Sequence, residues 1–163
     1  MTERIRPCLT FKDRAEEAID LYVSIFPNSK ITSLVRMDVD GGPIPKGKLL
    51  GATFELDGRE FRAFDGGATF TFSEGISIDV TCKTQEEVDR YWSKLTSGGG
   101  EEGPCGWLKD PFGVSWQIVP EALGRMLSDP SAGDSQACIQ AMLKMKKLDI
   151  ATLEKAYRGA AVS

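Results

Sequence analysis

The stretch Cys105-Gly106-Trp107-Leu108-Lys109-Asp110-Pro111-Phe112-Gly113-Val114-Ser115-Trp116-Gln117-Ile118-Val119-Pro120 decides the fold. It predicts a short strand, a tight turn at residues 110–113 and a second strand that ends at Pro120, because proline and glycine favour chain reversal. Side chains alternate across a strand, so Gln117 points away from the face that carries Trp116 and Ile118. We therefore expect Trp116 and Ile118 to pack on a helix and Gln117 to face a ligand cavity.

The first part of the chain predicts a strand, a helix and three further strands. The first strand covers residues 5–11, and Asp13 is expected to cap a helix that carries Glu16 at the capping-box position. Asp57-Gly58 is a strong two-residue hairpin signal between the last two strands. The three later strands are expected at residues 31–37, 50–56 and 59–65. The apolar residues of the helix recur at helical spacing, at Ala15, Ala18, Ile19, Tyr22, Ile25 and Phe26.

The same order of elements then repeats. A strand at 76–82 precedes a capping box at residues 84–87, which opens a second helix, and a run of glycines at 98–100 ends it. Short strands follow near 102–109 and at 114–119. A βαβββ pattern that occurs twice predicts an α+β fold, with modules at about 4–67 and 75–120 inside a domain at 1–127.

Residues 128–163 predict a linker and a C-terminal helical tail. The linker is rich in serine, aspartate, proline and glycine, and Asp149 is placed to cap a helix with Leu148 and Leu153 as a hydrophobic staple. Two interpretations remain open. The tail packs on its own domain, or it makes a contact between two copies of the chain.

Composition excludes several classes of partner. The 163 residues carry a formal net charge of −4, which argues against a nucleic-acid ligand because phosphate binding needs clustered lysine and arginine. There is no apolar run long enough to cross a membrane and no secretory leader, so we expect a cytoplasmic protein. The four cysteines are far apart, and we expect free thiols. The chain has no histidine.

Several motifs together resemble one family. They lie at residues 7–11, 15–18, 26–29, 57–58, 65–67, 76–78, 87–92 and 105–120, and at 141–147 in the tail. The repeat and the terminal strand of the form D-P-x-G-x-x-x-E/Q resemble the vicinal oxygen chelate superfamily, which includes glyoxalase I, bleomycin-resistance proteins and extradiol dioxygenases. The PhnB-like branch, also labelled "3-demethylubiquinone-9 3-methyltransferase", is the most similar.

This resemblance implies a fold, an assembly and a site. The fold is two βαβββ modules that form a curved mixed sheet around a cleft, usually in a homodimer. Active members bind a divalent metal there through histidine, glutamate or glutamine side chains on the first and last strands of each module. The matching positions of this chain hold Arg6 or Cys8, Arg62, Ser77 or Asp79, and Gln117.

Strand alternation supplies the candidate ligand-binding residues. They are Arg62, Gln117, Ser77, Asp79, Phe64, Thr53, Glu60 and Cys8. An arginine stays protonated and cannot ligate a metal, so we expect no metal cofactor. If a metal does bind, Gln117, Asp79 and Glu60 are the expected ligands, with Cys8 as a further donor.

Arg62 has two interpretations. A guanidinium in a cleft suits a carboxylate or phosphate group, with Ser77, Thr53 and Gln117 adding hydrogen bonds and Phe64 an apolar wall. Alternatively it pairs internally with Glu60, Glu55 or Asp79. The large aromatic residues Trp92, Trp107 and Trp116 are expected in the core.

Three functions remain open. The first is binding of a small anionic or aromatic molecule without a metal. The second is a metal-dependent lyase, isomerase or dioxygenase, and the third is a dimerisation or partner module with a filled cleft. No catalytic residue is predicted, since no histidine is present to activate a thiol.

Two signals are rejected. Residues 42–48 match G-x-x-x-x-G-K, but Leu49 follows, two prolines remove backbone donors and no helix is expected there. The methyltransferase label lacks a strand, glycine-rich turn and helix unit for an S-adenosyl group.

Overall fold

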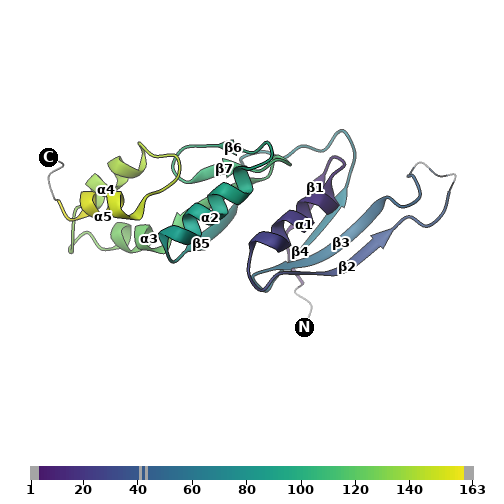
Figure 1. Cartoon of the computed structure of the whole chain (residues 1–163), viewed down its shortest axis with the longest axis horizontal. Helices are drawn as coiled ribbons and strands as arrows, with labels where there is room; N and C mark the ends of the chain where they lie inside the picture. Colours follow the sequence, from purple (N-terminus) through teal and green to yellow (C-terminus); the bar gives the residue numbers. More distant parts are fainter. Residues whose placement is uncertain (1–3, 41, 43, 160–163) are drawn as a thin grey trace. The chain divides into compact units, whose positions relative to one another are not determined.

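The computed structural model describes residues 4–40, 42 and 44–159, and the chain divides into two compact units, Met1–Phe72 and Ser73–Ser163 (Figure 1). The described residues of the two units form two four-stranded mixed sheets and five helices, so the predicted α+β fold with a βαβββ pattern in each half is confirmed. No helix among the described residues combines the length and apolarity needed to cross a bilayer.

The first unit is one βαβββ module. Its sheet has the order β1-β4-β3-β2, in which β1 runs parallel to β4 and the other pairs are antiparallel. Helix α1 contacts all four strands of this sheet and buries Tyr22 completely. The stacked rings of Phe54 and Phe61, 5.5 Å apart, join β3 to β4 on the same side. The elements are β1 (Cys8–Phe11), α1 (Ala15–Ile25), β2 (Lys30–Arg36), β3 (Leu49–Leu56) and β4 (Arg59–Asp65).

The start of α1 differs from the expectation. Arg14 is the N-cap residue and no side chain caps it, so the predicted capping by Asp13 is wrong. Instead, Asp65 at the end of β4 accepts a hydrogen bond from the Ala15 amide at 2.8 Å. A carboxylate from another strand thus replaces the local cap. The same carboxylate pairs with Lys48 at 3.2 Å, and the Asp65 side chain is only 6% exposed.

The second unit repeats this topology with the order β5-β8-β7-β6, and α2 covers one face. Thr84 caps α2 by accepting from the Glu87 amide at 3.3 Å, as predicted. The Glu87 carboxylate accepts from the amide of Lys83 rather than that of Thr84. The elements are β5 (Ile78–Cys82), α2 (Gln85–Thr96), β6 (Glu101–Glu102), β7 (Trp107–Lys109) and β8 (Ser115–Pro120).

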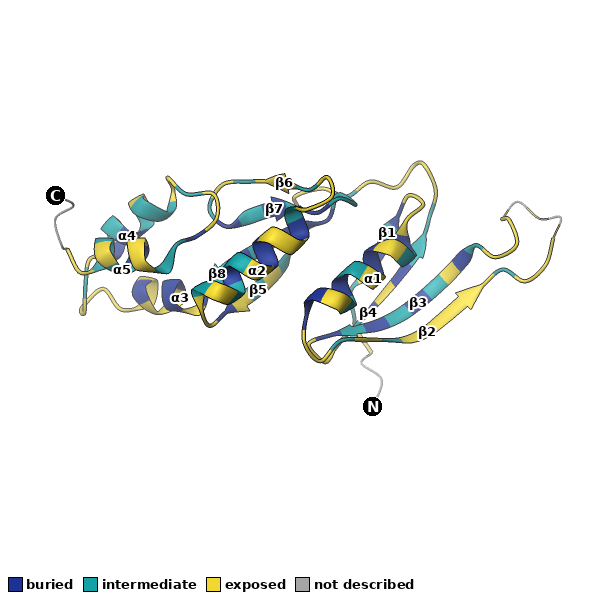
Figure 2. Cartoon of the chain, in the orientation of Figure 1, coloured by how far each residue is buried: buried dark blue, intermediate teal, exposed yellow. Residues whose placement is uncertain are grey.

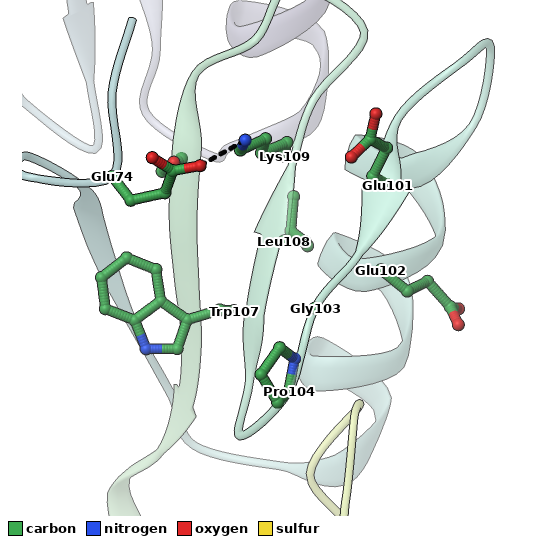
Figure 3. Close-up of a pocket in the computed structure, with 9 residues that line it drawn as sticks. Glu74, Glu101, Glu102, Gly103, Pro104, Trp107, Leu108 and Lys109 are labelled. Carbon is green, nitrogen blue, oxygen red and sulfur yellow. Dashed lines mark ion pairs between the residues drawn. The ribbon is translucent and has the colours of Figure 1, made fainter.

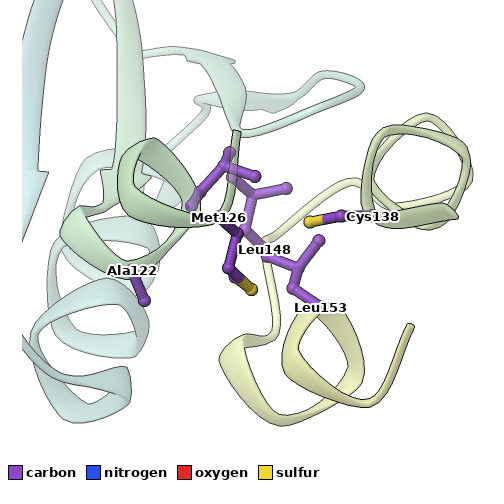
Figure 4. Close-up of a cluster of buried hydrophobic side chains, with 6 residues drawn as sticks. Ala122, Met126, Cys138, Leu148 and Leu153 are labelled. Carbon is purple, nitrogen blue, oxygen red and sulfur yellow. The ribbon is translucent and has the colours of Figure 1, made fainter. Parts of the chain in front are cut away.

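The C-terminal tail packs within the second unit. Helices α3 (Glu121–Ser128), α4 (Ser135–Met142) and α5 (Ile150–Tyr157) enclose a small apolar cluster that includes Met126, Cys138, Leu148 and Leu153 (Figure 4). Asp149 caps α5, and both leucines of the predicted staple are fully buried. Burying each such leucine contributes about 2 kcal/mol.

A buried carboxylate organises the turn between β7 and β8. Asp110 is 3% exposed, and its Oδ1 accepts from the amides of Phe112 and Val114 at 2.9 and 3.0 Å. Its Oδ2 accepts from Nε1 of Trp116 at 2.9 Å. Trp116 is fully buried on the face that α2 covers, so one carboxylate sets both the turn and the position of the central core residue.

We expect the substitution Asp110→Asn to lower the free energy of unfolding by about 2–3 kcal/mol. The amide nitrogen of asparagine is a donor, and it would face either the Trp116 Nε1–H or the two backbone amides. Urea unfolding followed by circular dichroism measures the change.

The matched control is Asp20→Asn, which alters an exposed aspartate on α1 and should change stability by less than about 0.5 kcal/mol. Trp116→Phe combined with Asp110→Asn should be less destabilising than the sum of the single changes. Simple additivity would show that the bond between these two side chains does not stabilise the fold.

Candidate functional site

Each sheet has one face packed on a helix and one open face, and the candidate residues lie on the open faces. On the first sheet, the strand register pairs Cys8 with Arg62 and Arg62 with Thr53. These three side chains therefore form a row across β1, β4 and β3, in which Cys8 and Arg62 are exposed and Thr53 is half-buried. Phe64 lies two residues further along β4 on the same face.

Glu60 and Glu55, two of the acids proposed as internal partners of Arg62, pair with other residues instead. Glu60 pairs with Arg6, and Glu55 pairs with Lys30 at 3.4 Å. Within residues 4–40, 42 and 44–159, no carboxylate forms an ion pair with the Arg62 guanidinium. The first unit therefore presents an exposed cation whose neighbouring acids are already paired with other residues.

On the second sheet, Gln117 is the centre of a polar group. It is the register partner of Asp79 on β5 and of Trp107 on β7. Its Nε2 donates to the Ser77 hydroxyl at 2.9 Å, which fixes the orientation of the amide. The structure thus brings Gln117, Ser77 and Asp79 together, with Gln117 half-buried and Asp79 exposed.

The second unit also carries a groove of about 410 Å³ (Figure 3). The register places Trp107 opposite Gln117 and Lys109 opposite Ser115, so these lining residues share the open face with Gln117. The ring of Trp107 and the ring of Pro104 supply apolar surface. The lining residues are Glu74, Glu101, Glu102, Gly103, Pro104, Trp107, Leu108, Lys109 and Ser115.

An ion pair closes one end of the groove. Lys109 pairs with Glu74, and this hydrogen bond raises the pKa of the lysine and lowers the pKa of the glutamate (Figure 3). Both groups are open to solvent, so the pair contributes little to stability. The rest of the lining is mainly apolar, but it keeps two further carboxylates, those of Glu101 and Glu102.

Sequence reasoning missed Trp107 as a groove residue and placed it in the core. Trp116 and Trp92 are core residues, but Trp107 is half-buried and lines the groove. The signal was present in the alternation, because Leu108 is buried on the helix side and its neighbour must point the other way.

The described residues do not make a conventional divalent-metal site. In the described ranges, no three cysteine, aspartate or glutamate side chains gather closely enough to ligate one ion. Asp79 and Gln117 are register partners, and the carboxylate of Glu60 pairs with Arg6. The donor chemistry does not fit, since a protonated guanidinium stands in the row on the first sheet.

Two motifs from the sequence remain, at residues 65–67 and at residues 42–48. In the first, the Asp65 carboxylate caps α1 and pairs with Lys48. The segment before Leu49 is followed by β3 and not by a helix, so the rejection of a P-loop is confirmed; Pro43 lies outside the described residues.

A family model described as 3-demethylubiquinone-9 3-methyltransferase matches residues 3–119. A PhnB protein from Bacillus cereus is 38% identical with a TM-score of 0.66, covering 72% of this chain and 99% of its own. Protein PA1353 from Pseudomonas aeruginosa is 21% identical with a TM-score of 0.62, covering 74% of this chain and 98% of its own.

A more distant structure shows the same fold. It is the fosfomycin resistance protein FosX from Listeria monocytogenes in complex with Mn(II) and sulfate, which is 15% identical with a TM-score of 0.52 and covers 72% of this chain and 91% of its own. No protein with a curated description matches the chain. The family match ends at residue 119, so helices α3, α4 and α5 lie outside it.

We expect Cys82 and Cys138 to resist alkylation in the folded protein while Cys8 reacts. Burial raises the pKa of Cys82 to about 12, with Glu87 and Asp79 adding to the shift, and burial also raises the pKa of Cys138. The fold therefore favours the protonated thiol of Cys82. This stabilisation is fully present below the ordinary pKa of 9.0 and is lost as pH rises toward 12.

Iodoacetamide labelling at pH 8, followed by peptide mass spectrometry, measures the rates. The variant Cys8→Ser should remove a fast-reacting thiol without changing the slow ones. Rapid labelling of Cys82 at pH 8 would contradict the burial described for it.

Proposed function

The chain belongs to the 3-demethylubiquinone-9 3-methyltransferase family, and we propose that it is a protein of the vicinal oxygen chelate type that binds a small aromatic or anionic molecule without a resident metal. The observation that carries this proposal is the groove on the second unit. Its half-buried Trp107 lies opposite Gln117 in the strand register, and the Gln117 amide is fixed by Ser77 on the same open face. An apolar surface next to a fixed polar group is typical of small-molecule sites.

The groove chemistry favours a flat apolar group. Trp107 and Pro104 offer ring faces, and an aromatic contact adds about 0.5–1.5 kcal/mol beyond the area that it buries. Ser77 and Gln117 lie beside it and can orient a polar substituent through hydrogen bonds. The Ser115 side chain adds a further polar group among the lining residues.

Arg62 supports binding of an anion on the first unit. A guanidinium presents a planar set of donors that matches carboxylate and phosphate groups. The carboxylates nearest along the sheet pair with Arg6 and Lys30, so an external anion meets little internal competition.

Methyl transfer has no support in the fold. The loops that lead from β1 into α1 and from β5 into α2, residues 12–14 and 83–84, contain no glycine, and β8 runs directly into α3. A nucleotide-like cofactor is usually bound at a glycine-rich turn that lets its backbone approach the ligand. A metal-dependent reaction remains the alternative function for this superfamily, and metal analysis separates it from metal-free binding.

A homodimer is part of this proposal. Strand β2 is the outer strand of its sheet and is exposed along most of its length (Figure 2). Leu34, Val35 and the adjacent Leu50 are exposed there. Exposed apolar side chains at a sheet edge mark a surface that another chain can cover. The same exposed edge also supports a partner-binding module as a further alternative.

A cytoplasmic location is also part of the proposal, and it agrees with the four free cysteines.

Native mass spectrometry with metal analysis, on protein purified without chelator, tests the proposal. We expect a dimer with no stoichiometric divalent ion and with an organic molecule bound. One metal ion per chain would overturn the metal-free proposal and favour a metal-dependent enzyme. A metal-free dimer without ligand would favour the partner module.

Two variants identify the anion contact in the same experiment. An anionic co-purified molecule should be lost from Arg62→Ala and kept by Arg59→Ala, which removes another exposed arginine of β4. Equal retention by both variants would remove Arg62 from the site.

A titration tests the groove directly. We expect Trp107→Ala to weaken binding of 1-anilinonaphthalene-8-sulfonate at least about tenfold, since about 1.4 kcal/mol of contact energy corresponds to that factor. Fluorescence of the probe reports binding.

The control Phe70→Ala removes an exposed aromatic ring of the first unit and should leave the affinity unchanged. Equal affinity of Trp107→Ala and the unmodified protein would show that the probe does not occupy the groove.

A further inference from the structure

One wall of the groove depends on an unusual turn between β6 and β7. Gly103 and Pro104 line the groove, and the two residues that follow have positive φ angles, 56° at Cys105 and 83° at Gly106. A side chain at Gly106 would meet the Ile118 carbonyl oxygen at 2.9 Å and Leu148 Cδ1 at 3.1 Å, so glycine is required there. The turn leads directly into Trp107.

The C-terminal tail supplies the hydrogen-bond acceptors for this turn. We name residues 145–150 the strap. The Cys105 amide donates to the Met145 carbonyl and the Gly106 amide donates to the Lys146 carbonyl, each at 2.8 Å. On its other side, the Gly106 carbonyl accepts from the Ile118 amide at 2.8 Å. The turn is thus fixed between β8 and the strap.

Helix α2 fixes the strap in turn, mainly through Gln85. Its Nε2 donates to the Leu148 carbonyl at 3.0 Å, and its Oε1 accepts from the Ile150 amide at 2.8 Å. Lys147 pairs with Asp89 at 2.5 Å, and this bond, with a second from Gln85, lowers the pKa of Asp89. Leu148 is fully buried in the cluster between the helices.

The strap lies outside the residues that the family model matches. The family match ends at residue 119, and the Bacillus cereus structure covers 99% of its own chain but 72% of this one. The contacts to Cys105 and Gly106 therefore come from a segment that this match does not include.

We propose that Gln85 and the strap are positioning elements that fix the Pro104–Trp107 wall and thereby set the ligand affinity of the groove. The effect on affinity rests on the proposed function, whereas the positioning of the wall does not. The causal sequence is direct. Gln85 orders the strap, the strap carbonyls order the turn, and the turn places Pro104 and Trp107.

The test is Gln85→Ala, with Gln136→Ala as the matched control. Gln85 is the first residue of α2, whose cap is supplied separately by Thr84, so the helix remains capped. Gln136 is an exposed glutamine of α4. Hydrogen exchange measured by NMR should become at least about tenfold faster at the Cys105 and Gly106 amides in Gln85→Ala and stay unchanged in Gln136→Ala.

Two further measurements report the consequence for the groove. Acrylamide should quench tryptophan fluorescence more strongly in Gln85→Ala, and the difference should disappear when Trp107→Phe is added. The affinity for 1-anilinonaphthalene-8-sulfonate should fall about threefold to tenfold. Lys147→Ala should change all three quantities in the same direction by less, and it replaces Gln85→Ala if that variant does not fold.

The outcomes separate this inference from the proposed function. Unchanged exchange and quenching in a folded Gln85→Ala variant overturn the positioning role. Faster exchange with unchanged probe affinity overturns its effect on binding. If the unmodified protein fails to bind the probe, the proposed groove function fails, while exchange and quenching still decide whether the strap fixes the wall.

Discussion

The buried carboxylate of Asp110 is the constraint on which the second unit depends. A charge removed from water is costly unless donors surround it, and this one receives two backbone amides and the indole of Trp116. Those bonds set the turn, and the turn sets the register of β7 against β8. Trp116 lies under α2, so alternation along β8 places Gln117 on the open face. Trp107 is the register partner of Gln117 and lies on the same face, where it lines the groove.

The two modules reach the same topology by different local bonds. At the end of β4, Asp65 caps α1 from a neighbouring strand. The corresponding end of β8 is Pro120, which has no side-chain acceptor. In the second module α2 is capped by Thr84, the residue that directly precedes the helix. Pro120 instead leads directly into α3, so the second module gains a helical tail at the position where the first has a carboxylate.

Sequence patterns predicted the fold closely because they report local physics. Alternation gave the two faces of β8, and the Asp57-Gly58 signal gave the hairpin between β3 and β4. The cap of α1 was wrong because Asp65 is distant in sequence and close in space. The groove could be predicted only in part, since Glu74 meets Lys109 and the strap meets Cys105 through contacts that no local pattern encodes.

The chemistry of the open faces suits recognition better than proton transfer. The chain has no histidine to exchange protons near neutral pH. Across the part of the chain that the structure describes, these faces offer the Arg62 guanidinium, which pairs with no carboxylate there, an amide fixed by Ser77 and a half-buried indole. Such groups suit the ligand binding that we propose, because none of them has to change its charge in order to hold a ligand.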